Sequence, residues 1–304
     1  MNTKNNGKKL IAVVGATGKQ GGAVVRALQA SGQFNVRALS RDPSKHRELA
    51  DEVFEADLNR PETLKAAFEG AHGVFLVTNF FQEKGADELK QATAAVRAAK
   101  DAGVKHLIWS TLPNVEAISG GKFHVPHFTG KAKVDSIVKA AGFASHTFVI
   151  APFYFQNLAG VLGPQKLPDG SLGWAVPLDP DVRCIHMGDI NELGVIVTAA
   201  FLHADKVGNG QYLPFIGDFL SFNEIVETLN QQGHQLSVKQ VPTELFATFF
   251  PGAAEIAEMF NYFQAHTYLG SDSSDRIALA TKIAGRQPTK FSTWARLNFP
   301  VQNA

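Results

Sequence analysis

Short apolar runs alternate with stretches of helical periodicity through the first half of the chain. Apolar runs bounded by turn residues are typical of strands buried in a parallel sheet, whereas apolar positions three and four apart predict amphipathic helices. The runs predict strands over 9–15, 34–42, 52–57, 73–79, 105–111 and 145–155, and the periodic stretches predict helices over 21–31, 61–70, 85–103 and 131–142. Repeated alternation with short links favours an α/β fold with a doubly wound parallel sheet of the Rossmann type.

The alternation ends near residue 155, and the second half follows a different pattern. Residues 163–181 are rich in proline and glycine and have little periodicity, which predicts irregular structure. Ser221 and Glu224 have the spacing of a capping box at a helix start. Further helices are expected over 189–204, with Asp189 as its cap, 221–233 and 251–266, and a returning strand is expected over 210–217.

These patterns predict two domains. Residues 1–155 would form a Rossmann domain, and residues 156–304 a smaller, loop-rich α+β domain, some segments of which return to the first. We expect the second domain beside the strand ends, because open α/β sheets bind ligands at the carboxyl ends of their strands.

Composition mainly excludes classes of partner. The 304 residues carry a net charge of +1, so no direct nucleic acid binding and no membrane binding is expected. The polar start and the short apolar run after it predict neither a signal peptide nor a membrane span. Cys184 is the only cysteine, which excludes an internal disulfide and favours a cytoplasmic protein, with a nuclear share left open. No metal site is expected, because His124 and His127 have no neighbouring ligands in sequence, and monomer and homodimer both stay open.

A glycine-rich turn follows the first predicted strand. Gly15, Gly18 and Gly21 form a G-x-x-G-x-x-G pattern between that strand and the first helix. A tight turn, a close approach of backbone to a pyrophosphate and close helix packing each need a residue without a side chain. The helix start then offers free N–H groups to the phosphates. The pattern predicts a dinucleotide site, and a plain turn is the alternative.

The end of the second strand indicates which dinucleotide. A free ribose 2′-hydroxyl usually meets an acidic residue here. This chain has Ser40 and Arg41 instead, and Arg41 can hold a 2′-phosphate, with Arg37 or Lys45 adding charge. Asp42 precedes a proline and is better interpreted as a turn residue. NADP(H) is therefore preferred over NAD(H), and a solvated Arg41 is the alternative.

Two more strand ends carry polar residues. Asp57 and Leu58 follow the third strand, where an adenine would pass, and Thr78 and Asn79 end the fourth, where a ribose would lie. Taken alone, each of these residues is equally well explained as a cap at the end of its strand. Together they place polar groups at one crevice.

Several motifs carry a family resemblance. The chain resembles the short-chain dehydrogenases/reductases, and more narrowly their atypical NmrA-like branch with its NADPH-sensor members, in "GATGKQGG", "VRALSRDP", "VFLVTNFF", "PHFTGKAKVD", "APFYFQNL" and "GPQKLPDG". The resemblance covers nearly the whole chain. It implies a Rossmann domain, a small C-terminal domain and NADP(H) between them.

The resemblance also implies roles for individual residues. The pyrophosphate would lie on Gly15, Thr17, Gly18, Lys19, Gln20 and Gly21, and the 2′-phosphate on Ser40 and Arg41. The adenine would lie by Asp57 and Leu58, the riboses by Thr78, Asn79, Phe80 and Lys131, and the nicotinamide end under Tyr154, Phe155 and Asn157.

His127 and Lys131 depart from the family's catalytic pair. Short-chain enzymes use Tyr-x-x-x-Lys, in which lysine lowers the pKa of a tyrosine that exchanges a proton with the substrate. Here His127 occupies the position of the tyrosine. Three interpretations stay open: His127 replaces the proton donor, Lys131 binds ribose while His127 is a bystander, or both are surface residues. Gly130 suggests that the helix begins only near this point. The roles of Ser110 and Thr111, which end the fifth strand, are open as well.

The missing tyrosine shapes the functional hypothesis. We expect an NADP(H) redox sensor that regulates a protein partner through loops at 80–87 and 155–180. The alternative is an NADPH-dependent reductase of quinones or similar reactive carbonyl compounds, and a third hypothesis is a scaffold without redox response. For a small aromatic or quinone-like ligand, the candidate walls, which are also explained as plain core, are Phe249, Phe250, Met259, Phe260 and Phe263.

Overall fold

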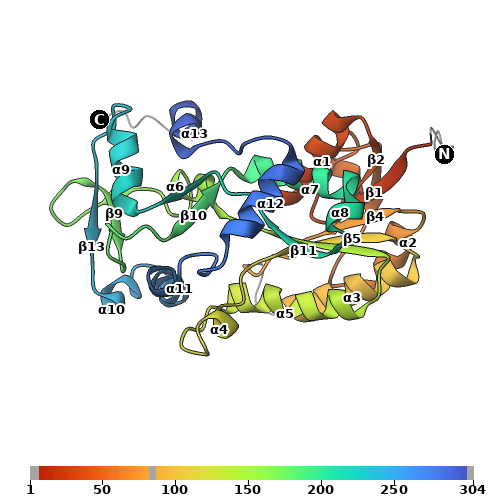
Figure 1. Ribbon diagram of the computed structural model, residues 1–304, viewed down its shortest axis with the longest axis horizontal. Coiled ribbons are helices and arrows are strands. Elements are labelled where there is room, and N and C mark those ends of the chain that lie inside the picture. Colours follow the sequence, from red (N-terminus) through yellow and green to blue (C-terminus); the bar gives the residue numbers. More distant parts are fainter. Residues whose placement is uncertain (1–6, 82–86, 300–304) are drawn as a thin grey trace.

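The computed structural model describes residues 7–81 and 87–299, and one half of it is built around a seven-stranded parallel sheet (Figure 1). The strand order is β11-β6-β5-β4-β1-β2-β3. The bounds are β1 Lys9–Val13, β2 Phe34–Ser40, β3 Glu52–Glu55, β4 Gly73–Leu76, β5 His106–Thr111, β6 Ser145–Ile150 and β11 Asn209–Pro214. The order of the strands reverses between β1 and β4, which makes their carboxyl ends the expected ligand crevice. The predicted doubly wound sheet is confirmed.

Helices cover both faces of this sheet. One face carries α2 (Leu64–Phe68), α3 (Glu88–Asp101) and α5 (Pro126–Ala140), whose apolar residues share a core with β4 and β5. The other face carries α1 (Lys19–Ser31), α7 (Leu193–Leu202) and α12 (Ser274–Ala284). In α1 the predicted apolar face is buried, because Val24, Val25 and Leu28 are all inaccessible. Short helical segments lie in the connections between these elements: η1 Pro43–Lys45, η2 Pro61–Thr63, η3 Ile190–Glu192, α4 Val115–Ile118 and α8 Ala204–Val207.

A smaller region lies at one end of the sheet layer (Figure 1). Its two three-stranded sheets have the orders β12-β10-β7 and β13-β9-β8. The strands are β7 Phe153–Tyr154, β8 Gln165–Lys166, β9 Leu172–Val176, β10 Ile185–Gly188, β12 Asp218–Leu220 and β13 Leu236–Gln240. The helices are α6 Phe155–Leu158, α9 Phe222–Asn230, α10 Thr243–Phe246, α11 Ala253–His266 and α13 Phe291–Asn298. The second half of the chain also returns β11, α7 and α12 to the large sheet.

Local signals placed several element ends well. Ser221 and Glu224 form the predicted capping box of α9, and Asp189 accepts a hydrogen bond from the Asn191 amide as the predicted cap. The strand predicted over 145–155 is divided in two: β6 ends at Ile150, and β7 begins at Phe153. Pro152 lies between them and has no N–H to donate to a neighbouring strand.

Two predictions about elements were wrong. Residues 163–181 contain β8 and β9 rather than only irregular structure, because β9 pairs with β13 more than 60 residues away, a partner that no local pattern encodes. Helix α5 begins at Pro126 instead of near Gly130, because proline suits the first position of a helix. The start of the helix predicted from residue 85, most of the loop at 80–87 and most of the leader lie outside the described residues.

Helix α7 approaches α1 closely at Gly194, where an added Cβ would lie 2.2 Å from the Ala23 carbonyl oxygen. We therefore expect Gly194→Ala to lower the free energy of unfolding by about 2 kcal/mol or more, because backbone atoms cannot move aside easily. Gly130→Ala is the matched control within a helix, since its Cβ would meet the nearest atom at 3.5 Å, an ordinary contact. Urea unfolding followed by circular dichroism measures both, and equal stability of the two variants would contradict this account.

Candidate functional site

One cavity of about 980 Å³ opens at the carboxyl ends of the large sheet, between it and the smaller region. It brings together nearly every residue singled out from the sequence. Its lining includes Gly15, Thr17, Gly18, Lys19, Gln20, Gly21, Ser40, Arg41, Asp57, Leu58, Thr78, Asn79, Phe80, His127, Lys131, Tyr154 and Asn157. Phe155 does not line it, because its ring is fully buried between Phe291 and Trp294.

The glycine turn has the geometry of a phosphate cradle. Gly15 has a φ of +67°, which favours glycine, and its carbonyl accepts a hydrogen bond from the Gly18 amide at 2.9 Å. An added Cβ on Gly21 would lie 2.2 Å from the Gly15 carbonyl oxygen, so the helix can approach the turn only with glycine there. The N-cap Gly18 gives α1 no side-chain cap. The first N–H groups of α1 therefore face the cavity mouth without a capping side chain, as an anionic ligand requires.

The three residues predicted to supply charge for a 2′-phosphate divide into one available cation and two that are engaged. Arg37 is buried, forms an ion pair with Glu52 at 2.7 Å and donates to two carbonyl groups near the end of α2. Lys45 forms an ion pair with Asp42 at 3.0 Å. Arg41 lines the cavity, is exposed, and has no hydrogen bond or ion pair with the part of the chain that the structure describes. Its guanidinium is thus the group best placed for a 2′-phosphate.

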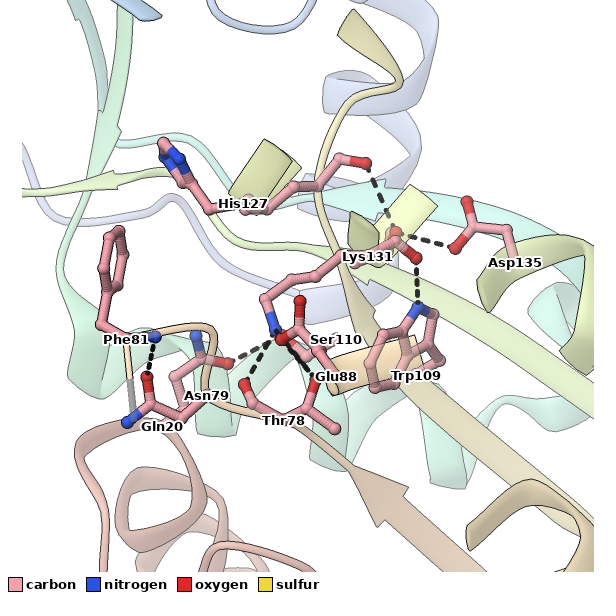
Figure 2. A network of polar contacts seen from close by, with 12 residues as sticks. Gln20, Thr78, Asn79, Phe81, Glu88, Trp109, Ser110, His127, Lys131 and Asp135 are labelled. Atoms are coloured by element: carbon pink, nitrogen blue, oxygen red, sulfur yellow. Dashed lines mark hydrogen bonds and ion pairs between the residues drawn. The ribbon is translucent and has the colours of Figure 1, made fainter. Parts of the chain in front are cut away.

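Lys131 lies inside the cavity wall in a network that Figure 2 shows. Its Nζ donates to Glu88 Oε1 at 2.5 Å, to the Thr78 carbonyl at 2.8 Å and to Thr78 Oγ1 at 3.1 Å. An ammonium has three hydrogens, so these three acceptors satisfy it completely. Burial lowers the pKa of Lys131, and the charge of Glu88 opposes that shift. Trp109 lies beneath the ammonium, with its ring centroid at 5.5 Å.

Glu88 is a site residue that the sequence did not reveal. It occupies the first turn of α3 behind the cap Asp87, where a glutamate usually only complements the helix dipole. In the structure it is buried, accepts the Thr78 hydroxyl at 2.6 Å, and has one oxygen, Oε2, without a partner among the described residues. Gly130 faces this oxygen.

His127 is held from the other side of the cavity. Glu255, in the first turn of α11, accepts hydrogen bonds from both the backbone N–H and the Nδ1 of His127, at 3.0 and 2.6 Å. Burial tends to raise the pKa of Glu255, but its bonds to His127 outweigh this effect and lower it. The imidazole lies beside the rings of Phe80 and Phe81, with centroids 5.9 and 5.3 Å away. Figure 2 shows His127 and Phe81. Neither His127 nor Lys131 is therefore a freely solvated surface residue.

Behind Lys131, Asp135 joins the same helix to two strands. Its oxygens accept the hydroxyls of Thr111 at 2.7 Å and Tyr212 at 2.8 Å. Burial raises the pKa of Asp135 to about 6, while these two hydrogen bonds act in the opposite direction. The open role of Ser110 becomes clearer as well, because its hydroxyl donates to Gln20 Oε1 at 2.7 Å and ties β5 to the glycine turn.

The remaining candidates divide between the core, the surface and the cavity wall. Cys184 is fully buried, and burial raises its pKa to about 12, which fits packing rather than a nucleophile. Phe250 and Met259 line the cavity, but Phe260 and Phe263 belong to the core and Phe249 is an exposed surface residue. Residues 7–81 and 87–299 contain no cluster of potential metal ligands and no helix long and apolar enough to span a membrane.

The chain matches the model of the NmrA-like family over residues 7–295. This chain belongs to the NmrA-like family. An NmrA-like family domain-containing protein of Dictyostelium discoideum is 31% identical over 284 residues, which cover 88% of this chain and 92% of that protein. The NmrA-like oxidoreductase FrzB of Cladobotryum sp is 34% identical over 245 residues, 73% of each chain. The resemblance identified from the motifs is confirmed.

Solved structures share the fold of this NmrA-like chain. The crystal structure of NmrA, a negative transcriptional regulator, in complex with NADP superimposes with a TM-score of 0.80 over 97% of this chain and 96% of that chain, at 24% identity. The prediction of a Rossmann-type sheet with a smaller C-terminal region is confirmed by this similarity. The predicted cofactor class is the one that this relative binds.

Arg41 gives the sharpest test of cofactor choice. We expect Arg41→Ala to weaken NADPH binding about 10- to 100-fold, because a charged hydrogen bond to phosphate is lost, and to leave NADH binding unchanged. Isothermal titration calorimetry measures both affinities. Arg97→Ala, an exposed arginine on α3, is the matched control. An equal loss for NADPH and NADH would remove Arg41 from 2′-phosphate recognition.

Asp135 predicts a pH dependence of stability. Its pKa is raised from 3.8 to about 6 in the folded protein, so the folded state holds this proton more tightly than the unfolded chain. The free energy of unfolding should therefore fall by up to about 3 kcal/mol as pH rises from 4 to 6 and then level off. Asp135→Asn should flatten this decline in urea unfolding series, whereas the exposed control Asp101→Asn should not. A decline of unchanged size in Asp135→Asn would contradict the assignment.

Proposed function

We propose that this NmrA-like chain binds NADP(H) and passes the redox state of the nucleotide to a protein partner. The residues fit the cofactor in three respects: Gly21 lets α1 approach the Gly15 turn closely, α1 presents an uncapped start, and Arg41 has no ion pair among the described residues. The 2′-phosphate would lie on Arg41 and Ser40, and the pyrophosphate on the turn from Gly15 to Gly21. When bound, the reduced nucleotide is a two-electron hydride donor.

The state of Lys131 carries this proposal. In the family's catalytic pair the lysine is available to the nucleotide ribose, but here all three of its hydrogens are taken by Glu88 and Thr78. A ribose hydroxyl at Lys131 would have to replace one of these acceptors. Because Glu88 lies in the first turn of α3, such a replacement would act directly on that end of the helix. A nucleotide could thereby change the surface of the protein without any chemical reaction.

The cavity mouth provides an apolar surface for the partner. Among the described residues, its exposed large apolar side chains are Phe81, Val161 and Phe250, with exposed fractions of 68%, 85% and 39%. Exposed apolar groups gathered at a ligand site are common where proteins or apolar ligands dock. The proposed partner would therefore contact the same edge at which the nucleotide acts.

A second candidate function is NADPH-dependent reduction of quinones or similar conjugated carbonyl compounds. The observation that favours it is the part of the cavity beside His127, where the rings of Phe80 and Phe81 lie next to the imidazole and Met259 lines the same cavity. These groups could hold a flat ligand next to a bound nucleotide. Reactive acceptors need less acid assistance than simple ketones, so the missing tyrosine does not exclude this chemistry.

One experiment distinguishes the two functions. We would measure hydrogen exchange of the protein alone, with NADPH and with NADP⁺, and in parallel NADPH oxidation with a panel of quinones. A sensor predicts that amide exchange in α3 and α5 differs between NADPH and NADP⁺ by about tenfold or more at some positions. The Lys131→Ala variant should lose this difference while still binding nucleotide through Arg41.

The outcomes separate clearly. Identical hydrogen exchange and identical affinity with NADPH and with NADP⁺ would reject the sensor. A ligand that binds two conformations equally well does not shift the equilibrium between them. Quinone-dependent NADPH oxidation that Lys131→Ala abolishes would favour the reductase. Failure of the wild-type protein to bind either nucleotide would reject both functions.

A further inference from the structure

His127 and Glu255 form a pair that bridges the two parts of the molecule. His127 lies at the start of α5 and Glu255 in the first turn of α11, and the two are 128 residues apart in sequence. Their side chains are 9% and 25% exposed. Both residues line the inner cavity. Sequence reasoning identified His127 but had no signal for Glu255, because only the tertiary fold places α11 against α5.

The charge of Glu255 determines which imidazole nitrogen is free. The lowered pKa of Glu255 keeps it ionised near neutral pH, and an ionised carboxylate only accepts hydrogen bonds. Nδ1 of His127 must therefore carry a hydrogen and donate it. Nε2 has no hydrogen-bond partner in the described ranges 7–81 and 87–299, and is left to meet a ligand. It is a proton donor when the imidazole is charged and an acceptor when it is neutral.

Aromatic rings lie beside the imidazole, and further apolar side chains line the same cavity. Phe80 and Phe81 lie on one side of the imidazole, and Phe250, Ile256 and Met259 line the cavity near α11. A flat ring fits between such walls. If the ring carries an oxygen, that oxygen would be its only polar atom and would need a hydrogen-bond partner. Leaving that oxygen unpaired in an apolar pocket would be costly, so one well-placed donor gives strong selectivity.

We propose that His127 binds the oxygen of a flat conjugated carbonyl compound, or of the corresponding phenol, and exchanges a proton with it, while Glu255 is the positioning residue that orients the imidazole. In the reductive direction a hydride is added to the ligand, the carbonyl π electrons move to oxygen, and that oxygen takes the proton from Nε2. His127 becomes neutral and recovers a proton from solvent. This inference rests on the second candidate function for its hydride, which a reduced dinucleotide supplies, but the binding step does not depend on it.

A structural role for Glu255 must be separated from this one. Its carboxylate also caps the backbone N–H of His127 at the start of α5, so Glu255→Ala could fail for reasons of stability. Glu255→Gln retains an oxygen for that cap but removes the charge that fixes the imidazole. The chain offers a matched control pair nearby. Glu258 accepts the His124 backbone N–H at 3.3 Å between the same two segments, but neither residue lines the cavity.

The test compares two flat probes, 1-naphthol and naphthalene, by equilibrium dialysis against protein saturated with NADP⁺. Wild type should bind 1-naphthol about tenfold more tightly than naphthalene. His127→Phe should reduce this ratio to about one while naphthalene affinity stays the same, and Glu255→Gln should reduce it in part. His124→Gln and Glu258→Gln should leave it unchanged. A wild-type ratio near one, or a ratio that survives in His127→Phe, would overturn the proposal.

Turnover tests the proton-transfer step separately. With NADPH and 1,4-naphthoquinone, we expect His127→Gln to lower kcat about 100-fold and Glu255→Gln about tenfold, with KM changed less than threefold in both. Two results would overturn proton transfer by this pair. One is an unchanged kcat in His127→Gln. The other is a wild-type protein that shows no turnover although it binds 1-naphthol more tightly than naphthalene as expected. The NADPH affinity of each variant, measured alongside, shows whether nucleotide binding itself has failed, which would reject the proposed function instead.

Discussion

The buried ion pair between Lys131 and Glu88 is the interaction on which the rest of the site depends. It joins α5, α3 and the end of β4, because Thr78 contributes both its carbonyl and its hydroxyl to the same cluster. Removing either charge from such a pair leaves the other buried and unpaired, which costs about 3–5 kcal/mol. The pair thereby fixes the wall of the cavity, and any ligand that recruits Lys131 must provide an equivalent acceptor.

The two ends of the cavity present different chemistry. At one end the glycine turn and the start of α1 offer backbone donors, and Arg41 offers a cation without an ion pair among the described residues; both suit phosphates. At the inner end aromatic rings surround His127, which suits a flat and mostly apolar group. A dinucleotide extends from polar phosphates to a planar ring. The polarity of the cavity therefore changes from one end to the other in the same way as the polarity of the proposed cofactor.

The C-terminal half completes the site instead of forming an independent body beside it. β11 adds an edge strand to the large sheet, and its Tyr212 donates to Asp135 behind Lys131. α7 approaches α1 so closely that only glycine fits at position 194. Glu255 reaches back to His127. A change at the nucleotide site can thus reach both parts of the molecule through direct contacts.

The sequence by itself determined the parallel sheet, the glycine turn and the positions of Arg41 and Lys131 at the cavity, because these depend on residues close together in the chain or on regular periodicity. Tertiary structure alone decided the partners of the two candidate catalytic residues. Glu88 and Glu255 lie 43 and 128 residues from the groups they bind, and in sequence both are ordinary glutamates in a first helical turn. Phe155 was wrongly assigned to the ligand site for the same reason. It is next to cavity residues in sequence, but its ring faces the core because α13 covers it. These roles arise from burial and from contacts between residues far apart in the chain, and the local sequence predicts neither.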